Sequence, residues 1–205
     1  MNAGIWDFWA PRYDSLWVQR WSLGPTRTRV LTHIPRNEGC RILDMGCGTG
    51  QLYGDLLGHF GELEFSYTGV DSSPGMLAEA ARKYPEATLV AASMSEYRSR
   101  SGAFDVIVCS HAFPYFEDQA AALHEFRRML DRRGHLVLTQ ASADNLYDSM
   151  VLFFVKLTTS HARYPSRDDM GTLAEPEFGQ VAETARVNRG FPIPSIYLFE
   201  WTVPA

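Results

Sequence analysis

The sequence has few cysteines, no long apolar run and no basic leader. Its three cysteines, Cys40, Cys47 and Cys109, are odd in number and lack C-x-x-C spacing, which is typical of reduced thiols and excludes a disulfide framework. The longest apolar run, Met150 to Val155, is far too short to cross a bilayer, and no basic stretch leads into an apolar one near Met1. We therefore expect a cytoplasmic protein without a transmembrane segment, and no metal site is predicted.

The sequence also has fewer basic than acidic residues, 19 against 24. The formal charge is -5 and the pI is near 5.7, so there is no broad attraction to phosphate backbones and no DNA partner is expected. A length of 205 residues with 45% hydrophobic composition supports one sizeable core. Small-molecule chemistry in a single domain is the favoured reading.

From Cys40 onward, short apolar or β-branched runs alternate with stretches of helical periodicity. Leu52, Leu56 and Phe60, for example, repeat at i, i+4 and i+8. This alternation predicts an α/β protein with a parallel sheet and helices on both faces. The expected buried strands are Cys40–Met45, Phe65–Val70, Thr88–Ala91, Phe104–Cys109 and His135–Thr139.

The two flanks of this core have their own predicted elements. The aromatic-rich stretch 5–34 is expected to form two helices divided near Gly24-Pro25. After Thr139 we expect a helix near 146–157, an irregular segment over 166–177, and strands over 181–187 and 196–203 that turn at 190–192 and pair antiparallel. The domain 1–205 would thus consist of a helical cap (1–36), a cofactor-binding core (37–140) and a substrate-side region (141–205).

The stretch ILDMGCGTG, residues 42–50, predicts a binding loop at the end of a strand. Gly46, Gly48 and Gly50 form G-x-G-x-G, whereas a dinucleotide loop needs G-x-G-x-x-G and here has Gln51 in the last position. Asp71 ends the next strand, where a carboxylate accepts hydrogen bonds from ribose hydroxyls. Sites for nicotinamide cofactors and sites for adenosyl cofactors both use such a glycine loop and acid. These residues alone therefore leave both kinds of cofactor open.

The ordered set of motifs separates the two ligands. It comprises residues 42–50, Asp71 followed by Met76, AASMSEY at 91–97, FDVIVCSHAFPYF at 104–116 and EFRRMLDRRGHLVLT at 125–139. In this combination the sequence resembles the class I S-adenosylmethionine-dependent methyltransferases, especially the small "type 11" group with the quinone and phospholipid methyltransferases. The resemblance implies S-adenosylmethionine as cofactor and a Rossmann-like, doubly wound, mostly parallel seven-stranded sheet with an antiparallel last strand.

The same resemblance implies roles for individual residues. Asp71 would hold the ribose, Ser72 or Met76 and Met94 would enclose the adenine, and Ser110 would face the methionine end. Tyr13, in an A-x-x-Y-D segment, would reach the cofactor. An acid common near the adenine amino group is replaced here by Ser93 or Ser95. The implied cofactor-binding residues are Tyr13, Asp44, Gly46, Cys47, Gly48, Gly50, Asp71, Ser72, Met76, Ser93, Met94 and Ser110.

The acceptor site is predicted beyond the carboxyl ends of the strands. The loop SHAFPYF differs from the D/N-P-P-Y/F of base methylases, and its Phe113, Tyr115 and Phe116 are expected to wall an apolar pocket. The other expected walls are Leu152, Phe153 and Phe154.

The N-terminal stretch IWDFWAPRYDSLW is a candidate lid over that site. Trp6, Trp9, Trp17 and Trp21 lie in or just after it, and at least two of them are expected to be helix core against the sheet.

His111 is the nearest titratable group to the reacting methyl by motif position, and its unperturbed pKa near 6.5 suits a general base. The alternative role for His111 is to shape the loop or to hydrogen-bond a backbone carbonyl. His124 and His135 are expected to be structural.

The predicted function is methyl transfer from S-adenosylmethionine to a small-molecule or lipid-like acceptor. Three alternatives remain: a non-catalytic S-adenosylmethionine-binding protein, an RNA or protein methyltransferase, and an NAD-dependent oxidoreductase. The oligomeric state is left open.

Overall fold

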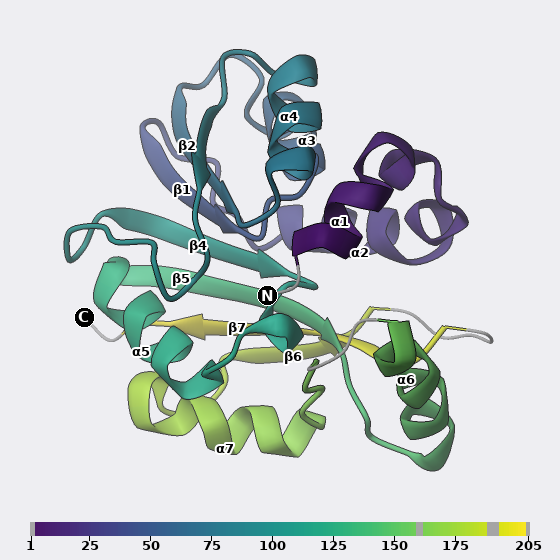
Figure 1. Cartoon of the computed structure of the whole chain (residues 1–205). Coiled ribbons are helices and arrows are strands. Elements are labelled where there is room, and N and C mark those ends of the chain that lie inside the picture. Colours follow the sequence, from purple (N-terminus) through teal and green to yellow (C-terminus); the bar gives the residue numbers. More distant parts are fainter. Residues whose placement is uncertain (1–2, 159–161, 188–192, 204–205) are drawn as a thin grey trace.

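The computed structural model describes residues 3–158, 162–187 and 193–203, and its centre is a seven-stranded sheet (Figure 1). The strand order is β3-β2-β1-β4-β5-β7-β6. Neighbouring strands among β1 to β5 pair in parallel, and β7 is antiparallel to both β5 and β6. The strands are β1 (Cys40–Met45), β2 (Phe65–Asp71), β3 (Thr88–Ala91), β4 (Phe104–Ser110), β5 (Leu130–Ala141), β6 (Glu183–Arg186) and β7 (Ile196–Thr202). The predicted doubly wound, Rossmann-like fold is confirmed.

The order of strands also locates the ligand crevice. The chain proceeds outward from β1 to β2 and β3 on one side and from β4 to β5 on the other, so the winding reverses between β1 and β4. In open α/β sheets, ligands bind at this reversal, beyond the carboxyl ends of the strands. Here those ends lead directly into Gly46 and His111.

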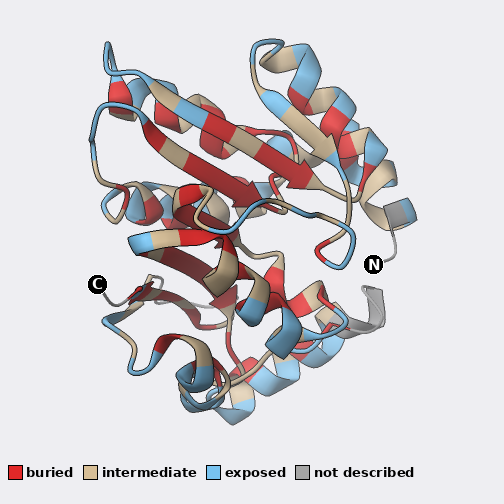
Figure 2. Cartoon of the chain, turned by 90° about the vertical axis from the view of Figure 1, so that its left-hand side faces the viewer, coloured by how far each residue is buried: buried red, intermediate tan, exposed pale blue. Residues whose placement is uncertain are grey.

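Helices cover both faces of the sheet and enclose two apolar cores. One core joins the sheet to α2 (Gly24–Leu31) and α3 (Gln51–Phe60), through Val30, Leu56 and Phe60. The other joins it to α5 (Gln119–Met129) and α7 (Arg167–Phe178), through Phe126 and Met170. Figure 2 shows the resulting buried residues running along the strands. The remaining long helices are α4 (Pro74–Lys83) and α6 (Leu146–Thr158).

Two local predictions are wrong. The segment expected to be irregular contains α7, which begins with a capping box in which Ser166 and Asp169 exchange side-chain and backbone hydrogen bonds. The expected break at Gly24-Pro25 is absent, because Pro25 occupies the first turn of α2, where proline is compatible with helix. The predicted turn at 190–192 lies outside the described residues.

The N-terminal segment instead changes direction at Leu16, which has an extended ψ of 141°. Before it come α1 (Ala3–Trp9) and the 3-10 helix η1 (Ala10–Ser15), and after it come the π-helical turn η2 (Gln19–Leu23) and α2. Within the part of the chain that the structure describes, no helix is both long and apolar enough to cross a membrane.

Candidate active site

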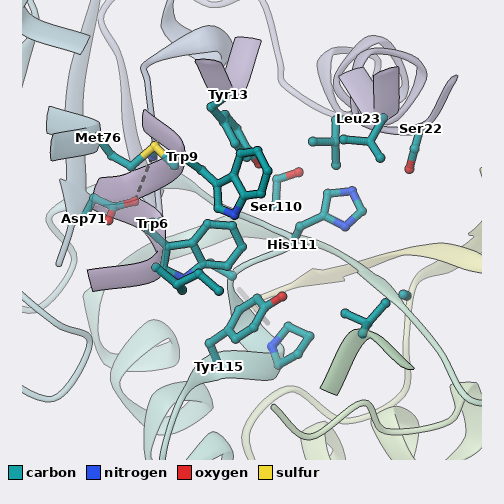
Figure 3. Close-up of a pocket in the computed structure, with 18 of the residues that line it drawn as sticks. Trp6, Trp9, Tyr13, Ser22, Leu23, Asp71, Met76, Ser110, His111 and Tyr115 are labelled. Carbon is teal, nitrogen blue, oxygen red and sulfur yellow. Dashed lines mark hydrogen bonds between the residues drawn. The ribbon is translucent and has the colours of Figure 1, made fainter. Parts of the chain in front are cut away.

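A cavity of about 790 Å³ lies at the carboxyl ends of β1, β2 and β4. This volume falls within the range of about 300–1,000 Å³ that small-molecule sites occupy. The N-terminal segment contributes Trp6, Trp9 and Tyr13 to its lining (Figure 3). Helix α6 contributes Leu152. The cavity therefore extends from the glycine loop to the region expected to receive the acceptor.

The glycine loop gives its backbone to this cavity. Gly46 has a φ of +84°, and a Cβ on it would meet the Ala112 Cβ at 2.2 Å, so no larger residue fits. Gly48 has a φ of +54°, and a Cβ there would meet nothing within 4 Å, which leaves open space beside its backbone. Gly50 differs: it caps α3 and packs against Ala80 and Tyr84, away from the cavity lining.

Asp71 lines the cavity at the end of β2 and organises the loops around it. One carboxylate oxygen accepts from the Gly48 N–H and the other from the Ser73 N–H, each at 2.9 Å. The Ser72 N–H donates to this carboxylate as well. Because a carboxylate has about four lone-pair sites, about one acceptor position remains for a ligand. Burial raises the pKa of Asp71, opposed by these N–H donors.

The predicted adenine side also lies along this cavity. Met76 and Met94 are both buried, and they line the cavity with Ser72 and Ser93. An acid, Glu96, follows Ser95, and its carboxylate accepts from the Ser93 N–H and hydroxyl, but this side chain is exposed and does not line the cavity.

A smaller cavity of about 70 Å³ lies behind the glycine loop. The residues that it shares with the large cavity are Tyr13, Leu23, Gly46, Gly48, Ser110 and His111.

Among the lining residues of the small cavity alone are Asp44, Cys47 and Arg27. Asp44 is fully buried on β1 and accepts from the Tyr67 hydroxyl at 2.9 Å, and burial raises its pKa to about 7. The sulfur of Cys47 is also buried, and its pKa is raised by burial and by Asp44.

Arg27 was not predicted from the sequence. Its Nε donates to Asp55 at 2.8 Å and its Nη1 donates to Gln51 at 2.6 Å, which fixes the guanidinium beside the glycine loop. Of the described residues that line either cavity, it is the single lysine or arginine. Arg27 lies in α2, ahead of β1 and the glycine loop, and it belongs to no recognisable motif. The sequence therefore carried no local signal for it.

His111 lines both cavities and has an unusual backbone. Its φ is +61°, and its N–H donates to the Thr139 carbonyl at 2.8 Å, while the hydroxyls of Ser110 and Thr139 are hydrogen-bonded to each other at 2.9 Å. The His111 Nε2 is buried and has no hydrogen-bond partner among the described residues. Burial, assisted by Arg27, lowers its pKa to about 4. The pKa of His111 thus lies below the unperturbed value near 6.5, because this imidazole is removed from water.

The N-terminal segment roofs the cavity through aromatic contacts. The Trp6 ring meets Tyr115 edge-on at 5.4 Å between centroids and meets Tyr13 at 6.3 Å (Figure 3). Asp14, next to Tyr13, accepts from the Thr49 hydroxyl at 2.5 Å and pairs with Lys83 at 2.6 Å. The segment is therefore tied to the glycine loop itself.

Several predicted acceptor-site walls are placed differently. Tyr115, Phe116 and Leu152 line the cavity as expected, but Phe113 is fully buried in the core and does not. Phe153 and Phe154 are about 60% exposed and point away from the sheet core.

The expectation that at least two N-terminal tryptophans form core is also wrong. None of the four is buried, and Trp17 and Trp21 are 57% and 64% exposed. His124 pairs on the surface with Glu177, and His135 with Glu200 on the neighbouring strand β7.

Residues 42–134 match the family model described as "Methyltransferase domain". The demethylmenaquinone methyltransferase of Beutenbergia cavernae is 31% identical over 143 residues, and the trans-aconitate 2-methyltransferase of Afipia carboxidovorans is 27% identical over 170. These matches cover 68% and 82% of this chain and 58% of each relative. The chain thus spans less than two thirds of the length of these curated relatives.

A solved structure of similar fold is that of a putative methyltransferase in complex with the Haloferax volcanii Trm112 methyltransferase activator. The match has a TM-score of 0.80 at 17% sequence identity and covers 98% of each chain. At this identity the likeness concerns the fold alone.

Fold, glycine loop and family match together define a class I methyltransferase domain. More particularly, it is of the small, S-adenosylmethionine-dependent type, and S-adenosylmethionine is the cofactor that family and fold imply. The residues present fit that cofactor. The space beside Gly48 and the remaining acceptor position on Asp71 suit a sugar hydroxyl, and the cation of Arg27 suits a carboxylate.

Proposed function

We propose that the protein transfers a methyl group from S-adenosylmethionine to an apolar, uncharged small molecule or lipid-like acceptor. The observation that carries this proposal is the chemistry of the large cavity. Among its described lining residues the one carboxylate is Asp71, no lysine or arginine is present, and His111 is neutral at pH 7. An acceptor with several carboxylates would lack any cation to bind it there.

The residues divide into two groups. Asp71, Met76 and Met94 are suited to hold the ribose and adenine, and Arg27 is suited to hold the amino-acid carboxylate. When bound, the cofactor supplies a methyl group on an activated sulfonium. The protein then has to align an acceptor atom with that methyl and to exclude water. Trp6 and Tyr115, in contact above the cavity, are suited to exclude water.

His111 is the proposed base for an acceptor that carries a proton. Because its pKa is about 4, the imidazole is neutral at pH 7, and in the tautomer with the proton on Nδ1 the buried Nε2 can take up the proton of an acceptor hydroxyl. A buried base of low pKa is weak, so it is best suited to an acidic phenol or enol.

The test is an assay of S-adenosylhomocysteine formation with a panel of acceptors. We expect turnover with demethylated quinols or long-chain phenols, in line with the demethylmenaquinone relatives. No turnover is expected with trans-aconitate, despite the similarity to trans-aconitate methyltransferases. Cofactor binding without turnover on any acceptor would favour a non-catalytic binding protein, and turnover on trans-aconitate would reject the apolar acceptor.

A further inference from the structure

Exposed apolar side chains are concentrated on two elements that line the large cavity. Of the ten large apolar side chains that are exposed among the described residues, four belong to the N-terminal segment and four to α6. Both elements line the same cavity, so the apolar wall continues onto the outer surface on two sides. The eight side chains are Phe8, Trp9, Trp17, Trp21, Leu146, Met150, Phe153 and Phe154, here called the mouth patch.

The composition of α6 is typical of a helix whose outer face packs against other protein or lipid. Its stretch 150–155 reads MVLFFV, in which Leu152 is buried and lines the cavity, whereas Met150, Phe153 and Phe154 face outward. A helix that is apolar on all sides is typical of a protein interior or a membrane environment. Figure 1 shows α6 away from the stacked strands of the sheet, below α1 and α2.

The N-terminal segment has the opposite sign of charge to the whole chain. Residues 1–36 contain five arginines and two aspartates, although the chain carries a net charge of -5. Both aspartates already have partners: Asp7 accepts from the Ser73 hydroxyl, and Asp14, which is exposed, pairs with Lys83. Arg12 and Arg20 are exposed, and the Arg20 guanidinium lies 5.7 Å from the centre of the Trp21 ring.

We propose that the mouth patch docks onto the surface of an anionic lipid bilayer. Exposed tryptophans interleaved with arginines are the combination that binds the interface of such a membrane. A protein partner seated here would close the cavity mouth, whereas a bilayer leaves it open to molecules dissolved in the lipid. That last step, delivery of an apolar acceptor, rests on the proposed function, but the docking itself does not.

The test is cosedimentation of the full chain with vesicles of phosphatidylcholine alone and of phosphatidylcholine mixed with phosphatidylglycerol. We expect binding to the mixed vesicles that weakens with added salt. The double variant Trp21→Ser/Phe153→Ser, whose residues do not line the cavity, should lower the partition coefficient by roughly tenfold. The variant Arg12→Gln/Arg20→Gln should abolish the preference for anionic vesicles.

The matched control is Leu57→Ser/Leu63→Ser, which removes exposed apolar side chains of α3 and of the loop after it, outside the mouth patch. All variants should keep the affinity of the wild type for S-adenosylhomocysteine, which shows that they are folded. Wild-type protein that stays in the supernatant with both vesicles would overturn the proposal, as would an equal loss in the control. A dimer that depends on Trp21 and Phe153 would overturn it in favour of a second copy.

An assay with detergent-solubilised acceptor separates the two proposals. Vesicle binding without turnover in detergent would reject the proposed function and leave the docking surface in place. Turnover in detergent without vesicle binding would reject the docking surface and leave the proposed function in place.

Discussion

The Asp7 carboxylate lies 2.6 Å from the Ser73 hydroxyl, and the same Oδ1 accepts from the Gly75 N–H at 2.8 Å. This contact joins the first helix of the chain to the first turn of α4, two residues beyond Asp71. Together with Asp14 on Thr49, it holds the aromatic roof against both cofactor-side loops. The roof is therefore attached to the site through two carboxylates.

The first prediction concerns the release of this roof. Asp7→Ala should speed hydrogen exchange of the amides over Trp9–Trp17 and weaken binding of S-adenosylhomocysteine, because the segment loses its anchor on α4. In the wild type, exchange over the same amides should slow when S-adenosylhomocysteine is added. Equal protection with and without ligand would show a fixed scaffold rather than a lid.

The pH dependence of this contact follows from the same carboxylate. Hydrogen bonds from Ser73 and Gly75 lower the pKa of Asp7, so the folded state binds its proton less readily than the unfolded state. Its contribution is complete above the unfolded aspartate pKa of about 3.9 and is lost as the pH falls through the lower folded value. The protection of the roof amides, that is, their exchange rates corrected for the intrinsic pH dependence of amide exchange, should thus be flat between neutral pH and about pH 5.

A second prediction concerns Asp71. Asp71→Ala should weaken S-adenosylhomocysteine binding by about 1.5–3 kcal/mol in calorimetry, the usual range for hydrogen bonds to a charged partner. Because Asp71 also accepts from Gly48 and Ser73, part of this loss would come from looser loops. Asp71→Asn keeps the size of the side chain and should show a smaller loss, and unchanged affinity in both variants would remove Asp71 from the site.

Arg27 carries the third prediction. Arg27→Gln should weaken S-adenosylhomocysteine by about 1.5–3 kcal/mol, but weaken 5'-methylthioadenosine, which has no carboxylate, much less. The control is Arg29→Gln on the same helix, which removes an exposed pair with Glu183. Equal losses for both ligands would indicate that Arg27 only shapes the loop through Asp55 and Gln51.

The fourth prediction concerns His111. If it is the base, His111→Ala should lower turnover by roughly 10²–10⁴ at unchanged cofactor affinity. The acid limb of kcat/KM should lie near pH 4 rather than 6.5, because the neutral form persists down to the lowered pKa of about 4. A loss below about fivefold with the wild-type pH profile would indicate that alignment alone suffices.

The same histidine affects stability with a definite sign. Its folded pKa of about 4 is below the unfolded value, so the unfolded state binds more protons between about pH 4 and 6.5. Stability should thus fall as the pH drops through this window, and His111→Gln should reduce the slope in thermal or denaturant unfolding.

The sequence was sufficient for β1 and β4 because each is a short, largely apolar run, whereas β5 begins at Leu130, before the apolar run that was predicted as this strand. It was misleading for α7, whose Gly171 and Pro176 interrupt the helical pattern, although the capping residues Ser166 and Asp169 were a usable signal. Only the fold shows what the helix buries, namely Met170 and Phe178.

The site residues also divide into those that the sequence predicts and those that only the fold shows. Asp71 follows from its place at a strand end, whereas Arg27 reaches the glycine loop through tertiary contacts that no local pattern encodes. The tryptophans were assigned to core because apolar side chains usually are, yet their neighbours here are a cavity and the outer surface.

The position of β7 between β5 and β6 has a consequence for synthesis on the ribosome. The cofactor-side strands β1 to β4 are all translated before β7, but β5 pairs along Ala141 to His135 with a strand made some 60 residues later. Until Ile196–Thr202 emerges, β5 presents an unpaired edge of apolar residues such as Leu136 and Leu138. The nascent chain is thus expected to need protection from aggregation in this late interval, and substitutions that weaken β7 should reduce soluble yield more than their effect on cofactor binding would suggest.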